Sequence, residues 1–152
     1  MVIGLSACCE KKIYCTSQVF DFAFTGFDRS EVRSFTLRRY KKDDQWGPVI
    51  DSAQYIYYGQ APVNPGRPDT LPFADYRTVG ALKGITAGND WAIYLPGTRK
   101  TYYITTIFTD GKNSQMVRCG DKTASCISAI TNFSINSDWQ NGGFIYIQKG
   151  KW

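Results

Sequence analysis

The clearest structural signal in the chain is the run Asp90-Trp91-Ala92-Ile93-Tyr94-Leu95-Pro96-Gly97-Thr98-Arg99-Lys100-Thr101-Tyr102-Tyr103-Ile104-Thr105-Thr106-Ile107. Its first part places Trp91, Ile93 and Leu95 on one face, which is the period of a half-buried strand. The Pro-Gly pair turns the chain at residues 96–99, and residues 100–109 return. We therefore expect a β-hairpin. Its second strand would carry Tyr102, Ile104 and Phe108 on one face and Tyr103, Thr105 and Ile107 on the other.

The same alternation recurs on both sides of this hairpin. Phe20, Phe22 and Phe24 share a face, and Phe35 and Leu37 are expected to point inwards. No segment has the spacing of an amphipathic helix. About eight or nine short strands, roughly 8–15 residues apart, indicate an all-β fold. We expect an Ig-like β-sandwich of about 8–9 antiparallel strands, and a small closed β-barrel would satisfy the same pattern.

A proline-rich stretch, residues 59–75, interrupts the strand pattern. Its prolines are Pro62, Pro65, Pro68 and Pro72. Proline cannot donate to a strand ladder, so no central strand is expected to pass through this stretch. A loop of this length is either functional or an insertion.

Composition narrows the possible functions. The 152 residues fit one domain, and an aromatic content of 15% favours β structure. The net charge of +5 is compatible with acidic glycans, anionic lipids or nucleic acid. The absence of histidine removes the commonest general acid or base and a principal metal ligand. We therefore expect a protein that is not an enzyme and needs no cofactor.

The N-terminal run Leu5-Ser6-Ala7-Cys8 resembles the bacterial lipobox, in which an aliphatic residue and two small residues precede a cysteine that receives lipid. The resemblance assigns the lipid to Cys8. It implies that residues 1–7 are the tail of a signal peptide that is removed, residues 8–15 a tether, and residues 16–152 a single β-sandwich domain. Two or more acyl chains on one cysteine give stable membrane anchoring. The alternative is an apolar N-terminus that forms a buried first strand.

The remaining cysteines form an even set. If Cys8 carries lipid, four are left, and in an oxidising compartment they can pair in three ways. Cys119 and Cys126 are separated by a short polar loop, so a bridge between them is one candidate. Cys15 could instead lie opposite one of the two and tie the start of the domain to its end. Without histidine or a Cys-x-x-Cys pair, a zinc site is not expected.

The hairpin run 90–107, the Cys119 and Cys126 pair and the strand Ile127-Ser128-Ala129-Ile130-Thr131-Asn132-Phe133-Ser134-Ile135-Asn136 together resemble uncharacterised small lipoproteins of Bacteroidota. Proteins of that group have a lipobox, a short tether and one all-β domain. The resemblance covers most of the chain and rests on strand patterns. It implies a location in the cell envelope, anchored to the outer membrane, and carries over no activity.

Exposed aromatic rings are the candidate ligand-binding residues. Tyr55, Tyr57 and Tyr58 precede the proline-rich stretch, and Trp46 precedes a Gly-Pro turn. Such rings could stack on sugar faces or pack against a peptide. Packing in the core is the competing explanation for each of them.

A basic cluster surrounds Tyr40, and its members are Arg33, Arg38, Arg39, Lys41 and Lys42. It could meet anionic glycans, lipid headgroups or phosphates. A solvated strand face or a protected edge strand explains it equally simply, because lysine and arginine discourage pairing between sheet edges. Export from the cell would also argue against a nucleic-acid partner.

These observations lead to one expectation about function. The chain is expected to be a non-enzymatic bacterial envelope lipoprotein that acts as an interaction or binding module. Its partners would be the membrane, through the lipid anchor, and a glycan or an envelope protein. The alternatives are a small secreted or periplasmic enzyme that acts on glycan, and a structural subunit of an envelope complex.

Overall fold

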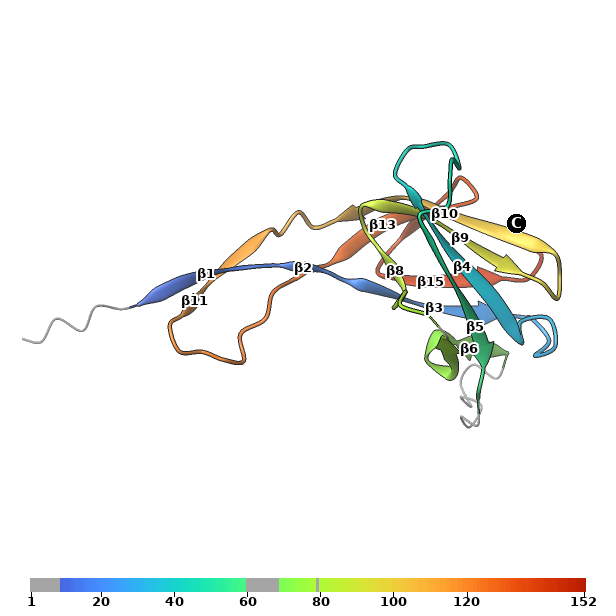
Figure 1. Ribbon diagram of the computed structural model, residues 1–152, viewed down its shortest axis with the longest axis horizontal. Coiled ribbons are helices and arrows are strands. Elements are labelled where there is room, and N and C mark those ends of the chain that lie inside the picture. The colour runs from blue at the N-terminus through green and yellow to red at the C-terminus, as the bar shows by residue number, and fades with distance from the viewer. Residues whose placement is uncertain (1–8, 60–68, 79) are drawn as a thin grey trace, which may run out of the picture.

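The computed structural model describes residues 9–59, 69–78 and 80–152, and these residues form an all-β protein (Figure 1). They contain fifteen strands and one 3-10 turn, η1 (Phe73–Asp75). None of the described residues forms a helix that is long and apolar enough to cross a membrane. The predicted all-β class is confirmed.

The largest sheet has seven strands in the order β14-β13-β10-β9-β4-β5-β7. Every neighbouring pair in it is antiparallel. The predicted hairpin is present as β9 and β10, in which Leu95 pairs with Lys100 across the turn. The strands are β4 (Ser34–Lys41), β5 (Asp51–Tyr57), β7 (Tyr76–Thr78), β9 (Asn89–Leu95), β10 (Lys100–Thr109), β13 (Ile130–Ile135) and β14 (Asp138–Asn141).

This sheet is open among the described residues. β14 and β7 each pair on one side only, so the two ends of the sheet do not meet. The closed-barrel alternative is therefore wrong. A period of two in the sequence shows which residues share a face, but it contains no information about whether the first and last strands pair.

The second sheet is built around β3 (Val19–Thr25). β3 pairs with β15 (Phe144–Gln148), β6 (Thr70–Pro72) and β8 (Ile85–Thr86). The β3–β15 pair is parallel, although only antiparallel strands were expected. The expected number of strands was also too low, because strands of two or three residues are too short to show an alternating pattern.

The core lies between the two sheets and is largely aromatic. Phe22 and Phe24 of β3 contact Phe35 of β4, with ring centroids 5.4 and 5.5 Å apart. Phe35 also stacks on Tyr55 of β5 at 4.7 Å. Trp91, Ile93, Leu95, Tyr102 and Ile104 are all buried on the same side of the large sheet. The faces predicted for these strands are confirmed.

One predicted face changes sides within β10. The pairing of β10 with β13 shifts register between Thr105 and Phe108, and Thr106 has a positive φ of 54°. This is a β-bulge, which inserts one residue and reverses the alternation beyond it. As a result Ile107 is buried and Phe108 is exposed, the reverse of what a regular strand would give.

A two-stranded ribbon projects from the two sheets (Figure 1). It pairs β1 (Glu10–Tyr14) with β11 (Ser114–Arg118). Where it joins the sheets, β2 (Thr16–Ser17) runs parallel to β12 (Ile127–Ser128). Residues 8–15 were expected to be a simple tether, but from Glu10 onwards they are one side of this ribbon. The expected signal-peptide tail, residues 1–7, and the proposed lipid acceptor, Cys8, lie outside the described residues.

Two disulfides bound the ribbon. They join Cys9 to Cys119 and Cys15 to Cys126. The predicted bridge between Cys119 and Cys126 is therefore wrong, although both cysteines are in disulfides. The reason is that the loop between them passes along the N-terminal strand, so each cysteine meets a partner on that strand instead of the other. The alternative that places Cys15 opposite one of the pair is the arrangement observed.

Candidate functional site

The candidate site is centred on Trp46, which lies in the loop between β4 and β5. Its indole meets the Tyr40 ring edge-on, with centroids 5.1 Å apart, and the Tyr103 ring at 4.2 Å. Tyr40 is buried, so it forms the floor under the indole. Trp46 nevertheless remains 38% exposed. The tryptophan is thus held in place from beneath while part of its surface is free to meet a ligand.

A hollow lies on each side of this indole. The first encloses about 330 Å³ and is lined, besides Trp46, by Asp43, Gln45, Asp90, Thr105 and Thr106. The second encloses about 340 Å³ and is lined, besides Trp46, by Thr101, Tyr103, Thr105, Asn136 and Ser137. Both volumes fall at the lower end of the range of small-molecule sites, about 300–1,000 Å³. Trp46 and Thr105 belong to both hollows, so the two form one continuous feature.

The backbone around the hollows adopts unusual conformations. Seven described residues other than glycine have a positive φ, and six of them line the hollows: Asp43, Gln45, Trp46, Thr106, Asn136 and Ser137. Asn136 and Ser137 form the two-residue turn between β13 and β14, where positive φ angles are normal. Thr106 is β-branched and has no such explanation beyond the bulge. Strained residues of this kind cost about 1–3 kcal/mol each and cluster at functional sites.

Hydrogen bonds fix the polar lining. The backbone N–H of Asp43 donates to Oδ2 of Asp90 at 2.9 Å. The N–H of Tyr103 donates to Oδ1 of Asn136 at 2.8 Å, and the N–H of Asn136 donates to the Tyr103 carbonyl at 2.9 Å. The Asn136 amide nitrogen is then the group that this side chain can offer to a ligand. These bonds hold the loop, the bulged strand and the β13–β14 turn in one arrangement.

Asp90 is the most unusual residue of the lining. It is only 8% exposed, and no lysine or arginine in the part of the chain that the structure describes forms an ion pair with it. A buried carboxylate normally has a charged partner or several hydrogen-bond donors. Asp90 therefore presents an acceptor at the edge of a hollow.

The predicted basic cluster does not form part of this site. Arg39 pairs with Asp51 at 3.7 Å, and the Arg38 guanidinium lies 5.6 Å from the centroid of the Tyr94 ring. Neither arginine lines a hollow. The cluster is therefore split between the two faces of β4 and is not one anion-binding patch.

The other predicted aromatic residues lie at the far end of β5 and do not join Trp46. Tyr55 is 2% exposed, its hydroxyl donates to the Leu82 carbonyl, and burial raises the pKa of its phenol. It is a core residue, so its predicted role in ligand binding is wrong. Tyr57 is half-buried and packs against Tyr76, with centroids 5.3 Å apart.

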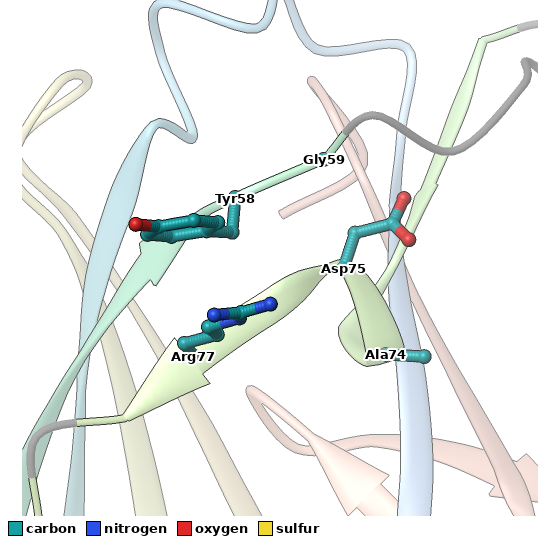
Figure 2. Close-up of a pocket in the computed structure, with 5 residues that line it drawn as sticks. All are labelled: Tyr58, Gly59, Ala74, Asp75 and Arg77. Carbon is teal, nitrogen blue, oxygen red and sulfur yellow. The ribbon is translucent and has the colours of Figure 1, made fainter.

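Tyr58 does line a pocket (Figure 2). This pocket encloses about 430 Å³ and is formed with Gly59, Ala74, Asp75 and Arg77. The Arg77 guanidinium lies 4.2 Å from the centroid of the Tyr58 ring and covers one of its faces. The pocket borders residues 60–68, which are outside the described residues, so Trp46 marks the better-defined site.

Sequence patterns single out Trp46 but not the residues around it. Tyr103, Thr105 and Asn136 come from β10 and from the β13–β14 turn, which are distant from Trp46 along the chain. Among the residues that the structure places, no group of three or more histidine, cysteine, aspartate or glutamate side chains could hold a metal ion. Comparison with known proteins finds no family model, no curated protein and no solved structure that matches the chain.

Proposed function

We propose that this protein is a lipoprotein of a bacterial cell envelope, held to the outer membrane through Cys8, and that its β domain is a non-catalytic binding module. The observation that carries the proposal is the pairing of the cysteines. Cys9, Cys15, Cys119 and Cys126 form two bridges, which leaves Cys8 as the one cysteine of the five without a disulfide role. Disulfides of this kind persist in oxidising compartments outside the cytoplasm.

The ribbon supports the proposed anchor. Cys9, directly after Cys8, is bridged at the end of the ribbon that lies away from the two sheets (Figure 1). A lipid on Cys8 would therefore attach to the tip of a cross-linked stalk, with the binding domain at its other end. The finer fold assignment, an Ig-like sandwich, belongs to the same proposal and is supported by the two facing sheets.

The binding role rests on the hollows around Trp46. A rigid, partly exposed aromatic residue between two polar hollows is a common form of ligand site. A glycan or an envelope protein would be the partner.

The anchor is tested by expressing the protein from its own locus and labelling the cells with radioactive palmitate. The expected result is label in the wild type and none in Cys8→Ser. The matched control is Cys9→Ser combined with Cys119→Ser, which removes one bridge and should leave the label in place. Label that persists in Cys8→Ser would overturn the anchor.

A further inference from the structure

We propose that the two hollows beside Trp46 bind a neutral oligosaccharide, with the indole stacked on one sugar ring and hydroxyl groups held on both sides of it. This inference rests on the binding-module part of the proposed function and names the ligand class. It does not depend on the lipid anchor.

The charges of the lining exclude an anionic ligand. The only charged side chains that line the hollows are the carboxylates of Asp43 and Asp90, and no lysine or arginine lines either hollow. The site is thus locally acidic on a protein whose net charge is +5. A phosphate, sulfate or uronic acid would be repelled here, whereas an uncharged ligand pays no such cost.

The polar groups match the hydroxyl groups of a sugar. The lining offers carboxylate acceptors, amide groups of Gln45 and Asn136, and the hydroxyls of Thr105 and Ser137. Sugar hydroxyls can donate to the former and accept from the latter. The carbon–hydrogen face of a sugar ring is apolar, and the exposed part of the Trp46 indole provides the surface for it.

Asp90 supplies an independent argument for a ligand that donates hydrogen bonds. Its carboxylate is buried, accepts a bond from the Asp43 N–H and has no ion pair in the described ranges. Bonds from neutral hydroxyl donors to an ionised acceptor are stronger than bonds between two neutral groups. A sugar hydroxyl in the first hollow would satisfy this carboxylate without bringing a charge.

The position in the sheet argues against a peptide added as an extra strand. The hollows lie over β10, and the backbone of β10 already pairs with β9 on one side and with β13 on the other. Strand addition requires a free sheet edge. The lining also contains few apolar side chains that could receive those of a peptide.

The test is affinity electrophoresis and calorimetry of the full chain. The probes are neutral hexose and N-acetylhexosamine oligomers, a sulfated oligosaccharide and an extended peptide. We expect binding to at least one neutral oligomer. Trp46→Ala should weaken it by about tenfold or more, the effect of removing a central aromatic contact. Asp90→Asn, which keeps an acceptor for the Asp43 N–H, should weaken it by about tenfold through loss of the charged acceptor.

Trp139→Ala is the matched control. Trp139 is 50% exposed on β14 and lines neither hollow. Its removal should leave the affinity within about twofold, since an exposed residue outside the contact contributes little. Near-ultraviolet circular dichroism checks that each variant is folded, and Asp90→Asn serves as the test if Trp46→Ala is not.

Several results would overturn the inference. They are no binding to any neutral oligomer, binding to the sulfated probe or the peptide alone, or equal losses in Trp46→Ala and Trp139→Ala. The anchor fails separately. Protein that carries palmitate but binds no neutral oligomer overturns this inference alone, and protein that binds one without carrying palmitate overturns only the anchor.

Discussion

The two-sheet body and the ribbon are stabilised in different ways. In the body, side chains such as Phe22, Phe35 and Trp91 are almost fully buried between the sheets. In the ribbon, no residue of β1 is buried, and Tyr14 is 76% exposed. The ribbon instead has a disulfide at each end.

This difference shows how a projecting segment can be kept in a fixed conformation without a core. An isolated two-stranded ribbon is marginally stable at best in water, because it buries too little apolar surface. Cross-links compensate by reducing the conformational freedom of the unfolded chain. The body depends on burial and the ribbon on covalent closure, and the following variants separate the two.

Loss of both bridges is expected to have the largest effect. The first bridge closes a loop of about 110 residues and the second a ring of about 15, residues 9–15 and 119–126. Chain entropy assigns about 4.7 and 3 kcal/mol to loops of these sizes, or about 8 kcal/mol together. The variant with serine at Cys9, Cys15, Cys119 and Cys126 should therefore be close to unfolded in water. Guanidinium unfolding followed by tryptophan fluorescence measures the loss, and an unchanged midpoint would contradict the entropic role.

A core truncation in the body should rank next. Phe35→Ala removes a ring that touches Phe22, Phe24 and Tyr55, and such changes cost about 3–5 kcal/mol. The matched change in the ribbon, Tyr14→Ala, should stay within about 0.5 kcal/mol because the ring is exposed. Urea unfolding of both variants makes the comparison. Equal losses would mean that packing, and not cross-linking, holds the ribbon.

The same contrast explains how much of the fold the sequence reveals. The body strands are amphipathic, so alternation locates β3, β4, β5, β9 and β10 to within a few residues. β1 carries Glu10, Lys11 and Lys12 and buries nothing, so no pattern distinguishes it from a tether. It is a strand because β11 pairs with it and two bridges hold it there, and both causes are distant in the sequence.

The bulge at Thr106 and the site have a similar history. Bulges often carry glycine at the residue of positive φ, and here the residue is threonine, so nothing in the sequence announces the change of face at Ile107 and Phe108. Trp46 could be singled out because it precedes a turn. The hollows on either side of it could not, since they require three segments to meet in space.

Loss of a single bridge should have a smaller effect than either change above. When Cys9 and Cys119 are both serine, the bridge from Cys15 to Cys126 still closes the long loop. Only the closure of the ring of about 15 residues is lost, which is about 3 kcal/mol. The reciprocal pair of variants should cost the same, so the two losses together fall short of the loss in the fourfold variant. Additive losses would show that each bridge acts locally by supporting packing.

The smallest expected effect separates two carboxylates, one in each region. In the body, Lys149 donates to Oε2 of Glu31 at 2.8 Å, and this contact lowers the pKa of Glu31. In the ribbon loop, the hydroxyl and N–H of Thr123 donate to Oδ1 of Asp121 and lower the pKa of Asp121. Because both pKa values are lowered on folding, each contact stabilises the protein fully above the ordinary carboxyl pKa. That stabilisation is lost as the pH falls through the lowered value.

Salt should distinguish these two contributions. The Glu31 contact is an exposed ion pair, so added salt should screen it, whereas the Asp121 contacts are hydrogen bonds to uncharged groups. In low salt, Glu31→Gln and Asp121→Asn should each flatten the fall of the thermal midpoint between about pH 5 and pH 3, the range in which these carboxyl groups are protonated. In high salt, the effect of Glu31→Gln should shrink and that of Asp121→Asn should persist. If Asp121→Asn has no effect at any salt concentration, the loop between Cys119 and Cys126 does not unfold together with the body, and the ribbon is then an independent unit that the bridges keep folded.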